Sequence, residues 1–196
     1  ALGSLVRDVH EGRGETFHLG TSIASIDATS VTLDDGSTIA TDLVVLGVGV
    51  RPRGGLAEAA GLVVDQGVVV DEFLETSSPG IFAAGDIARW PGGIGGERVR
   101  VEHWVLAQRQ GQVAAANMLG AMRPFRDVPF FWSAHHDLTI RHVGYPQAWD
   151  EVRIDGDIAG RDCMLSYRKD GRTVAVATVG RDRQALEQAL ALAPPH

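Results

Sequence analysis

A short segment at residues 76–88 constrains this chain more than any other part of its sequence. It opens with a Pro-Gly turn, continues with an apolar run over residues 81–84, and ends in Gly85 and Asp86. The run predicts a buried strand, and ligands of open α/β sheets lie at the carboxyl ends of such strands. Gly85 lets a ligand approach the backbone closely, and the Asp86 carboxylate can accept hydrogen bonds from sugar-like hydroxyls. Because Gly-Asp also occurs in ordinary turns and at helix N-caps, the dipeptide alone leaves both interpretations open.

A second Gly-containing stretch lies at residues 42–52, with the sequence Asp-Leu-Val-Val-Leu-Gly-Val-Gly-Val-Arg-Pro. Its almost wholly apolar part, residues 42–48, predicts a strand that is buried on both faces. Gly47 and Gly49 follow in a turn that can pass close to a ligand. A generic exit from a strand into a loop would look the same.

The remaining pattern alternates short strands and helices before changing character near residue 123. In the first part, Asp-Gly at residues 35–36 predicts a hairpin over 31–39, and residues 92–96 predict a flexible loop. Further helices are predicted at 2–11, 56–60 and 101–119, and strands at 15–19, 21–26 and 68–71. In the second part, after an aromatic stretch, strands are predicted at 139–143, 151–154, 163–168 and 174–179, turns at 155–156 and 170–171, and a helix at 183–192.

The stretch Arg-Val-Glu-His-Trp at residues 100–104 is expected to open the long helix. Helix N-termini carry unsatisfied N–H groups and the positive end of the helix dipole, which suits a ligand edge that becomes negative. Trp104 is either a core aromatic residue or a ring that stacks on such a ligand. Glu102 is either an ordinary N-terminal helix charge or a hydrogen-bonding group for a bound amide.

Residues 76–88 closely resemble the second flavin-binding motif of the pyridine nucleotide-disulfide oxidoreductase superfamily. The resemblance implies that Asp86 holds the ribityl chain of FAD, with Gly85 beside it. Residues 42–52 resemble the superfamily motif where the chain leaves the NAD domain and returns to the FAD domain, which implies that Gly49 lies close to cofactor.

The branch is indicated by residues 100–104 and 128–133, which resemble ferredoxin and rubredoxin reductases and apoptosis-inducing-factor-like proteins. This resemblance implies that Trp132 brings an aromatic ring near the flavin. It also implies cofactor-binding roles for the residues that open the long helix, namely Glu102, His103 and Trp104. The glutathione-reductase branch is disfavoured because its C-terminal His-Pro motif is missing here.

The implied fold is part of a flavoreductase with two dinucleotide-binding domains, of mixed α/β and α+β class. Residues 1–48 would be the C-terminal part of the NAD(P)-binding domain and residues 49–122 that of the FAD-binding domain. Residues 123–196 would form the C-terminal reductase domain, an α+β unit with an antiparallel sheet. Because the sequence contains no Gly-x-Gly-x-x-Gly turn, neither pyrophosphate cradle is expected. FAD and NAD(P)H are therefore expected in the full-length protein but not in this piece, which we expect to be inactive alone.

The implied activity is that of an FAD-dependent NAD(P)H reductase that passes electrons to a ferredoxin, rubredoxin or Rieske-type protein. The alternatives are a non-catalytic redox sensor resembling apoptosis-inducing factor, and an NADH oxidase or peroxidase of the same superfamily. A homodimer remains open. Five arginines near the flavin-side elements are candidates for an acidic partner's docking patch, or are solvated surface residues: Arg98, Arg100, Arg109, Arg123 and Arg126.

Composition narrows the remaining classes. A net charge of −7 argues against nucleic-acid binding, and no apolar run approaches the length of a membrane span. The single cysteine, Cys163, cannot form an internal disulfide, and its apolar context fits a core residue in the reducing cytoplasm. No metal site is expected, because the adjacent residues His135 and His136 would face opposite ways on a strand, and no Cys or clustered carboxylates complete a site with them or with His103.

Overall fold

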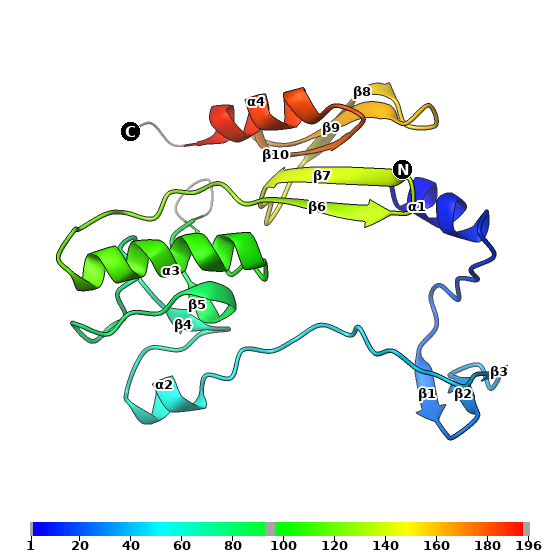
Figure 1. Cartoon of the computed structure of the whole chain (residues 1–196), viewed down its shortest axis with the longest axis horizontal. Coiled ribbons are helices and arrows are strands. Elements are labelled where there is room, and N and C mark those ends of the chain that lie inside the picture. The colour runs from blue at the N-terminus through cyan, green and yellow to red at the C-terminus, as the bar shows by residue number, and fades with distance from the viewer. Residues whose placement is uncertain (1, 93–96, 194–196) are drawn as a thin grey trace.

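The computed structural model describes residues 2–92 and 97–193, so most of the predicted loop at 92–96 lies outside the described residues. Three sheets and several helices are arranged around a central opening (Figure 1). None of the described helices has the length and apolar character that a membrane span requires. The helical elements are α1 (Leu2–Glu11), α2 (Gly55–Ala59), the 3₁₀ turn η1 (Gly85–Ile87), α3 (Trp104–Met118) and α4 (Asp182–Leu192).

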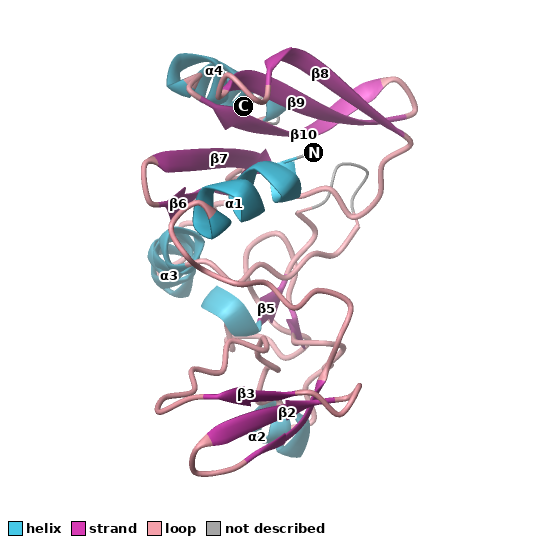
Figure 2. Ribbon diagram, turned by 90° about the vertical axis from the view of Figure 1, so that its right-hand side faces the viewer, coloured by secondary structure: helices cyan, strands magenta, loops and turns pink. Residues whose placement is uncertain are grey.

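The largest sheet is antiparallel and has five strands in the order β6-β7-β10-β9-β8. Its strands alternate apolar residues toward two faces, so neighbours such as Val176 and Ala177 enter different cores. Helix α1 covers one face and α4 covers the other (Figure 2). The strands are β6 (Phe130–His135), β7 (Leu138–Gly144), β8 (Glu151–Asp157), β9 (Asp162–Lys169) and β10 (Arg172–Val179).

Most predictions for this second part are confirmed, with two differences. Strand β6 was not predicted as a strand, because its sequence shows no clear alternation of apolar and polar residues. The turn predicted at residues 155–156 is wrong: both residues lie inside β8, and the chain turns at 158–161 instead. Gly156 has a φ of +94° and closely approaches Arg181 and Asp162, so this glycine serves close packing within the sheet and not a reversal of the chain.

A small antiparallel sheet follows α1 in the chain and has β2 as its central strand. Its strands are β1 (Ile23–Ile26), β2 (Ser30–Leu33) and β3 (Thr38–Ala40), and the predicted hairpin around Gly36 joins the last two. The strand predicted at residues 15–19 is wrong; these residues are irregular and connect α1 to the small sheet.

The buried strand predicted at residues 42–48 is also wrong. This stretch is irregular and runs as an extended crossing from β3 to α2 (Figure 1). Leu43, Val45, Leu46 and Val48 are between 61% and 85% exposed. The physical reason is that no strand among the described residues pairs with this stretch, and an apolar run becomes a buried strand only when neighbours supply its hydrogen bonds and cover both faces.

The central body packs α3 against η1 and against the short parallel strands β4 (Val68–Val69) and β5 (Ala88–Arg89). Its core centres on Trp90 and includes Leu74, Leu106 and Phe125. The strand predicted at residues 81–84 is wrong, because only a single bridge, Glu75 to Phe82, forms there. The long helix begins at Trp104 and not at residue 101, with His103 in an extended conformation before it.

Asn117 fixes the C-terminal end of α3 to the rest of the central body. Its amide donates to the carbonyls of Phe73 (2.7 Å) and Arg123 (2.8 Å) and accepts from the Arg123 backbone N–H (2.7 Å). The residue is only 6% exposed, so its removal leaves buried backbone groups without partners.

We therefore predict that Asn117→Ala lowers the free energy of unfolding by about 2–4 kcal/mol, measured by urea denaturation. Gln112→Ala is the matched control, since Gln112 is an exposed amide on the same helix. Its substitution should change stability by less than about 0.5 kcal/mol. Equal losses in the two variants would show that the buried amide is not what fixes this helix end.

Candidate functional site

The sequence Gly85-Asp86 forms a single 3₁₀ turn after the extended residue Ala84. Gly85 has a φ of +81°, a conformation that favours glycine. Its N–H donates a 2.7 Å hydrogen bond to Oε1 of Gln110, a fully buried residue of α3. The turn is thus anchored to the helix by a side chain that sequence reasoning missed. The available signal was a polar residue on the otherwise apolar stripe that includes Leu106 and Ala114.

The space beside Gly85 is limited. A Cβ on this residue would lie 3.4 Å from Cβ of Ala107, so α3 packs directly against the turn. The Nε2 of Gln110 is buried and has no hydrogen-bond partner among the described residues. A small residue, a buried acceptor and a spare buried donor therefore meet where the Gly-Asp turn and the first part of α3 come together.

The carboxylate of Asp86 is solvent-exposed and contacts no polar group of residues 2–92 or 97–193. By contrast, its backbone carbonyl accepts a 2.9 Å hydrogen bond from Arg100 Nη1. The same guanidinium forms a 2.8 Å ion pair with Glu102 through Nη2. Arg100 therefore holds the Gly-Asp turn and the approach to α3 together, and leaves the Asp86 carboxylate available.

Aromatic side chains from two distant segments gather at the N-terminus of α3. Trp104 and Trp132 lie with ring centroids 6.4 Å apart in an edge-to-face arrangement, and they are 60% and 48% exposed. The ring centroid of His103 lies 5.8 Å from that of Phe131 and 6.5 Å from that of Trp132. Large aromatic rings with this degree of solvent exposure indicate a surface that binds a ligand or a partner.

The helix end beneath these rings lacks a side-chain cap. His103 contributes its backbone carbonyl to Ala107 N–H (2.9 Å), but its imidazole does not cap the helix. The first N–H groups of α3 are therefore available to an acceptor, at the positive end of the helix dipole.

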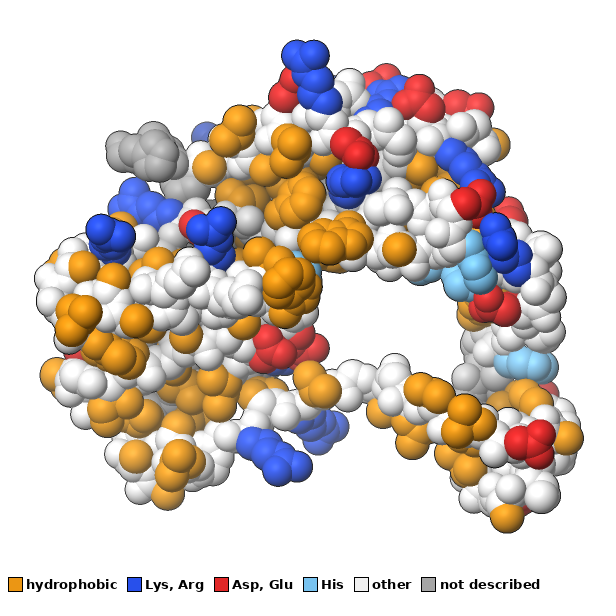
Figure 3. All heavy atoms as spheres, viewed as in Figure 1, with side chains coloured by type: hydrophobic (Ala, Val, Ile, Leu, Met, Phe, Trp, Pro, Cys, Tyr) orange, Lys and Arg blue, Asp and Glu red, His pale blue; other side chains and the backbone are white. Residues whose placement is uncertain are grey.

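Six of the seven residues expected at the site thus lie on three adjoining segments: the η1 turn, the start of α3, and β6. Gly49 is the exception. It lies in the extended crossing with a φ of +82°, and a Cβ there would have no heavy atom within 4 Å. Across the opening, hydrophobic side chains gather on the rim that faces this crossing (Figure 3).

Comparison with known proteins identifies the family of this chain. Residues 1–111 match the family model described as pyridine nucleotide-disulphide oxidoreductase, and residues 130–192 match the model described as reductase C-terminal. The chain belongs to the pyridine nucleotide-disulphide oxidoreductase family. The resemblance and the fold class expected from the sequence are confirmed: the chain is part of a flavoreductase fold, followed by a domain with an antiparallel sheet.

Similar proteins include reductases and an apoptosis-inducing factor. The ferredoxin–NAD(+) reductase component of the anthranilate 1,2-dioxygenase system of Burkholderia cepacia is 36% identical over 97% of this chain and 48% of its own length. Putidaredoxin reductase of Pseudomonas putida is 33% identical over 92% of this chain and 44% of its own length. Apoptosis-inducing factor 3 of Mus musculus is 30% identical over 92% of this chain and 31% of its own length.

Solved structures give the same result. The structure of the covalent putidaredoxin reductase–putidaredoxin complex superposes with a TM-score of 0.90 at 31% identity, covering 98% of this chain and 48% of the matched chain. The ferredoxin reductase of the CYP199A2 system from Rhodopseudomonas palustris gives 0.88 at 35% identity, over 97% and 50%. The chain spans about half the length of the reductases it matches, and about a third of the length of apoptosis-inducing factor 3.

The site suits part of the flavin nucleotide that the family uses. The exposed Asp86 carboxylate can accept hydrogen bonds from hydroxyls, the small Gly85 lets the turn lie close against Ala107 of α3, and the uncapped end of α3 suits an anionic ring edge. The exposed rings of Trp104 and Trp132 can flank a planar group. No phosphate cradle of the Gly-x-Gly-x-x-Gly type is present in the sequence, so the fit covers the ring and sugar-alcohol portions only.

Gly85 and Gly80 offer a matched pair for testing the site, because both have a φ near +81° but only Gly85 has α3 close by. We predict that Gly85→Ala reduces flavin content several-fold in the full-length protein, while Gly80→Ala leaves it unchanged. The cost of a positive φ, about 1 kcal/mol, is common to both, so the difference isolates the contact with Ala107. Flavin content is measured by absorbance per mole of protein, and equal contents in the two variants would contradict this role.

Proposed function

We propose that the full-length protein is an FAD-dependent NAD(P)H reductase that delivers electrons to a ferredoxin-type iron–sulfur protein. The observation that carries the proposal is the convergence of the Gly85-Asp86 turn, the N-terminus of α3 and the aromatic end of β6. The match to family models over residues 1–111 and 130–192 supports it.

Each residue of the site has a proposed role. Asp86 binds ribityl hydroxyls, and Gly85 gives the close approach that this requires. The α3 N-terminus after His103 stabilises the negative charge that develops on the pyrimidine edge of the flavin. Trp104 and Trp132 flank the ring and exclude water, while Glu102, oriented by Arg100, binds a nicotinamide amide. Gly49 approaches cofactor once its apolar crossing is covered.

A flavin held by these residues would supply hydride acceptance and single-electron release, and the role of the protein would be to position the flavin and to supply the electrostatic environment. We further propose that the described chain by itself retains neither FAD nor NAD(P)H at stoichiometric level, since pyrophosphate binding at a helix N-terminus carries much of dinucleotide affinity. The division into residues 1–48, 49–122 and 123–196 is proposed on the same basis. Within it, α1 contributes to the core of the third unit.

Asp86 allows a direct test, because its backbone contact with Arg100 survives any side-chain change. We predict that Asp86→Ala weakens FAD binding in the full-length protein by about 10-fold to 100-fold, the equivalent of one to two charged hydrogen bonds. Asp127→Ala, which removes another exposed carboxylate, is the control. Fluorescence titration of the apoprotein with FAD measures both affinities, and an unchanged affinity for Asp86→Ala would overturn the proposed role.

The structure divides the five candidate docking arginines into two groups. Arg98 donates to the carbonyls of Val70 and Arg89, and Arg100 donates to the carbonyl of Asp86. Both guanidinium groups therefore make hydrogen bonds within the central body. Arg109, Arg123 and Arg126 instead line one groove, together with apolar residues that include Trp132 and Leu190. A positive groove beside an exposed tryptophan suits an acidic protein that must approach the flavin.

We predict that the double substitution Arg109→Glu and Arg123→Glu slows ferredoxin reduction about tenfold or more at low salt, because it replaces attraction with repulsion during encounter. NADH-dependent reduction of a small neutral dye should stay unchanged. Arg172→Glu is a control at an exposed arginine that does not line this groove. The difference between variant and wild type should shrink as salt rises, and a salt-independent defect would show that the arginines do not steer an acidic partner.

The same assays separate the alternatives. Slow turnover with a long-lived reduced flavin would favour a redox sensor, for which the similarity to apoptosis-inducing factor 3 is the supporting observation. Efficient oxygen or peroxide reduction would favour an oxidase or peroxidase. Rubredoxin and Rieske proteins are tested as acceptors beside ferredoxin. We also propose a cytoplasmic location and a homodimer.

A further inference from the structure

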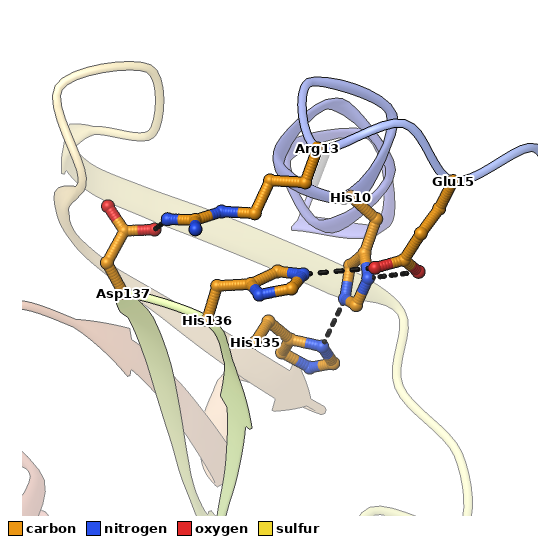
Figure 4. Close-up of polar contacts among 6 residues, drawn as sticks. All are labelled: His10, Arg13, Glu15, His135, His136 and Asp137. Carbon is orange, nitrogen blue, oxygen red and sulfur yellow. Dashed lines mark hydrogen bonds and ion pairs between the residues drawn. The ribbon is translucent and has the colours of Figure 1, made fainter.

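Histidines and a carboxylate from two distant parts of the chain meet where α1 ends beside the β6–β7 hairpin (Figure 4). Glu15 lies between His10 and His136: its Oε2 is 2.6 Å from His10 Nδ1, and its Oε1 is 3.0 Å from His136 Nε2. One nitrogen from each ring and one carboxylate oxygen lie within 4.8 Å of one another. This cluster is separate from the flavin-side residues described above.

The fold holds these groups in place from both sides. Helix α1 is fixed by its apolar stripe against the large sheet, and the residues after it, with Gly14 at a φ of +93°, turn Glu15 back toward His10. His136 lies in the hairpin turn with a φ of +56°, so its side chain is released from the alternation of the strand. Arg13 then bridges the two segments through a 3.2 Å contact with Asp137.

We propose that His10, Glu15 and His136 form a binding site for a Zn²⁺-like divalent transition-metal ion. Two imidazoles and one carboxylate are a donor set that zinc takes in proteins, with water in the fourth position. The three side chains are 20%, 48% and 32% exposed, so an ion has access from solvent and a water ligand has room. Hard ions such as Mg²⁺ prefer all-oxygen sites and are not expected to compete.

Binding an ion would require a local adjustment of the three side chains. Ligand atoms around a tetrahedral zinc ion are separated by about 3.3 Å, given bonds of about 2.0–2.1 Å. The two hydrogen-bonded contacts of 2.6 Å and 3.0 Å, which run through different oxygens of Glu15, would widen by less than 1 Å. One atom from each of the three residues lies within 4.8 Å of the others, so the widest separation would shrink by up to about 1.5 Å.

A second row of hydrogen bonds suits the metal-bound state. His10 Nε2 lies 3.1 Å from His135 Nδ1, and His135 Nε2 lies 2.9 Å from Ser133 Oγ. Once Nδ1 of His10 binds an ion, its proton resides on Nε2 and is donated to His135, which in turn donates to Ser133. Metal-bound histidines almost always have such a partner on the second nitrogen. His135 thus orients His10 without binding the ion, in keeping with the opposite directions expected for adjacent strand residues.

The nearby charges permit a cation. Asp137 is paired with both Arg13 and Arg161, and these pairs leave Glu15 as the carboxylate that faces the two imidazoles. An ion at this position would connect the segment after α1 to the β6–β7 hairpin. The expected consequence is stabilisation of the contact between α1 and the large sheet, because the ion binds only the folded arrangement.

The test is isothermal titration of the purified full chain with ZnCl₂ after removal of any histidine tag. We expect one site of micromolar or tighter affinity, a Zn²⁺-dependent rise in Tm of a few degrees, and no response to MgCl₂. His10→Gln, Glu15→Gln and His136→Gln should each weaken binding at least a hundredfold, because each removes a direct ligand. His135→Gln should have a smaller effect, of about tenfold.

His18→Gln is the matched control, since His18 is an exposed histidine on the same segment and should leave Zn²⁺ affinity unchanged. Glu15→Gln keeps the size and hydrogen-bonding capacity of the side chain, so it separates loss of a ligand from loss of structure. The Tm without metal and the far-ultraviolet circular dichroism establish that each variant is folded. Visible Co²⁺ absorption typical of tetrahedral coordination should appear in the wild type and disappear in His136→Gln.

Two results would overturn the proposal. One is the absence of Zn²⁺ binding by the wild type at micromolar concentration, which would leave Glu15 as a hydrogen-bond acceptor between two imidazoles. The other is binding of equal strength in the three ligand variants, which would place the ion elsewhere. Neither result depends on flavin binding or electron transfer.

Discussion

The position of helix α3 depends on two buried amides. Gln110 accepts a hydrogen bond from the Gly85 N–H near the middle of the helix, and Asn117 satisfies the backbone at Phe73 and Arg123 near its end. A buried polar group without its partners is costly, so these contacts fix both the rotation and the axial position of the helix. The rest of the stripe is apolar and would tolerate sliding more readily. Two specific contacts therefore set where the helix N-terminus, with His103 and Trp104, faces the Gly-Asp turn.

The same constraint reaches the large sheet. Asn117 holds Arg123 by two hydrogen bonds, and the chain then runs through buried Phe125 into β6. This path delivers Trp132 to Trp104, although the two residues are far apart in sequence. Arg100 provides the third connection, since one guanidinium contacts both the Asp86 carbonyl and the Glu102 carboxylate. The candidate site is thus built from three segments joined by side chain–backbone contacts and not by a continuous sheet.

Sequence patterns predicted the features that depend on residues close together in the chain. The stripe of α1, the hairpin at Gly36 and most strands of the large sheet follow from periodicity and turn chemistry, which are local. The positive φ of Gly85 is local in the same sense, because a glycine after an apolar run indicates a turn. The predictions that failed depend on contacts with distant segments. Residues 42–48 and 81–84 have apolar runs suited to buried strands, but a strand forms only where another segment of the chain pairs with it. The role of Gln110 was hidden for the same reason, because its partner is 25 residues away.

The histidine cluster shows this limit most clearly. Adjacent His135 and His136 were expected to face apart, and in the structure only His136 contacts Glu15. The alternation of a strand concerns only adjacent residues and gives no information about His10 and Glu15. These two residues lie more than 100 positions away in the sequence and reach the hairpin because α1 packs against the large sheet. The packing that brings them there is apolar and nonspecific in chemistry: Val9 among Leu138, Cys163 and Val179. A hydrophobic contact between a helix and a sheet can therefore bring together a set of polar donor groups that no local sequence pattern predicts. Burial determines which face of the helix packs on the sheet, and the polar residues at the edge of that face then lie beside polar residues of the sheet.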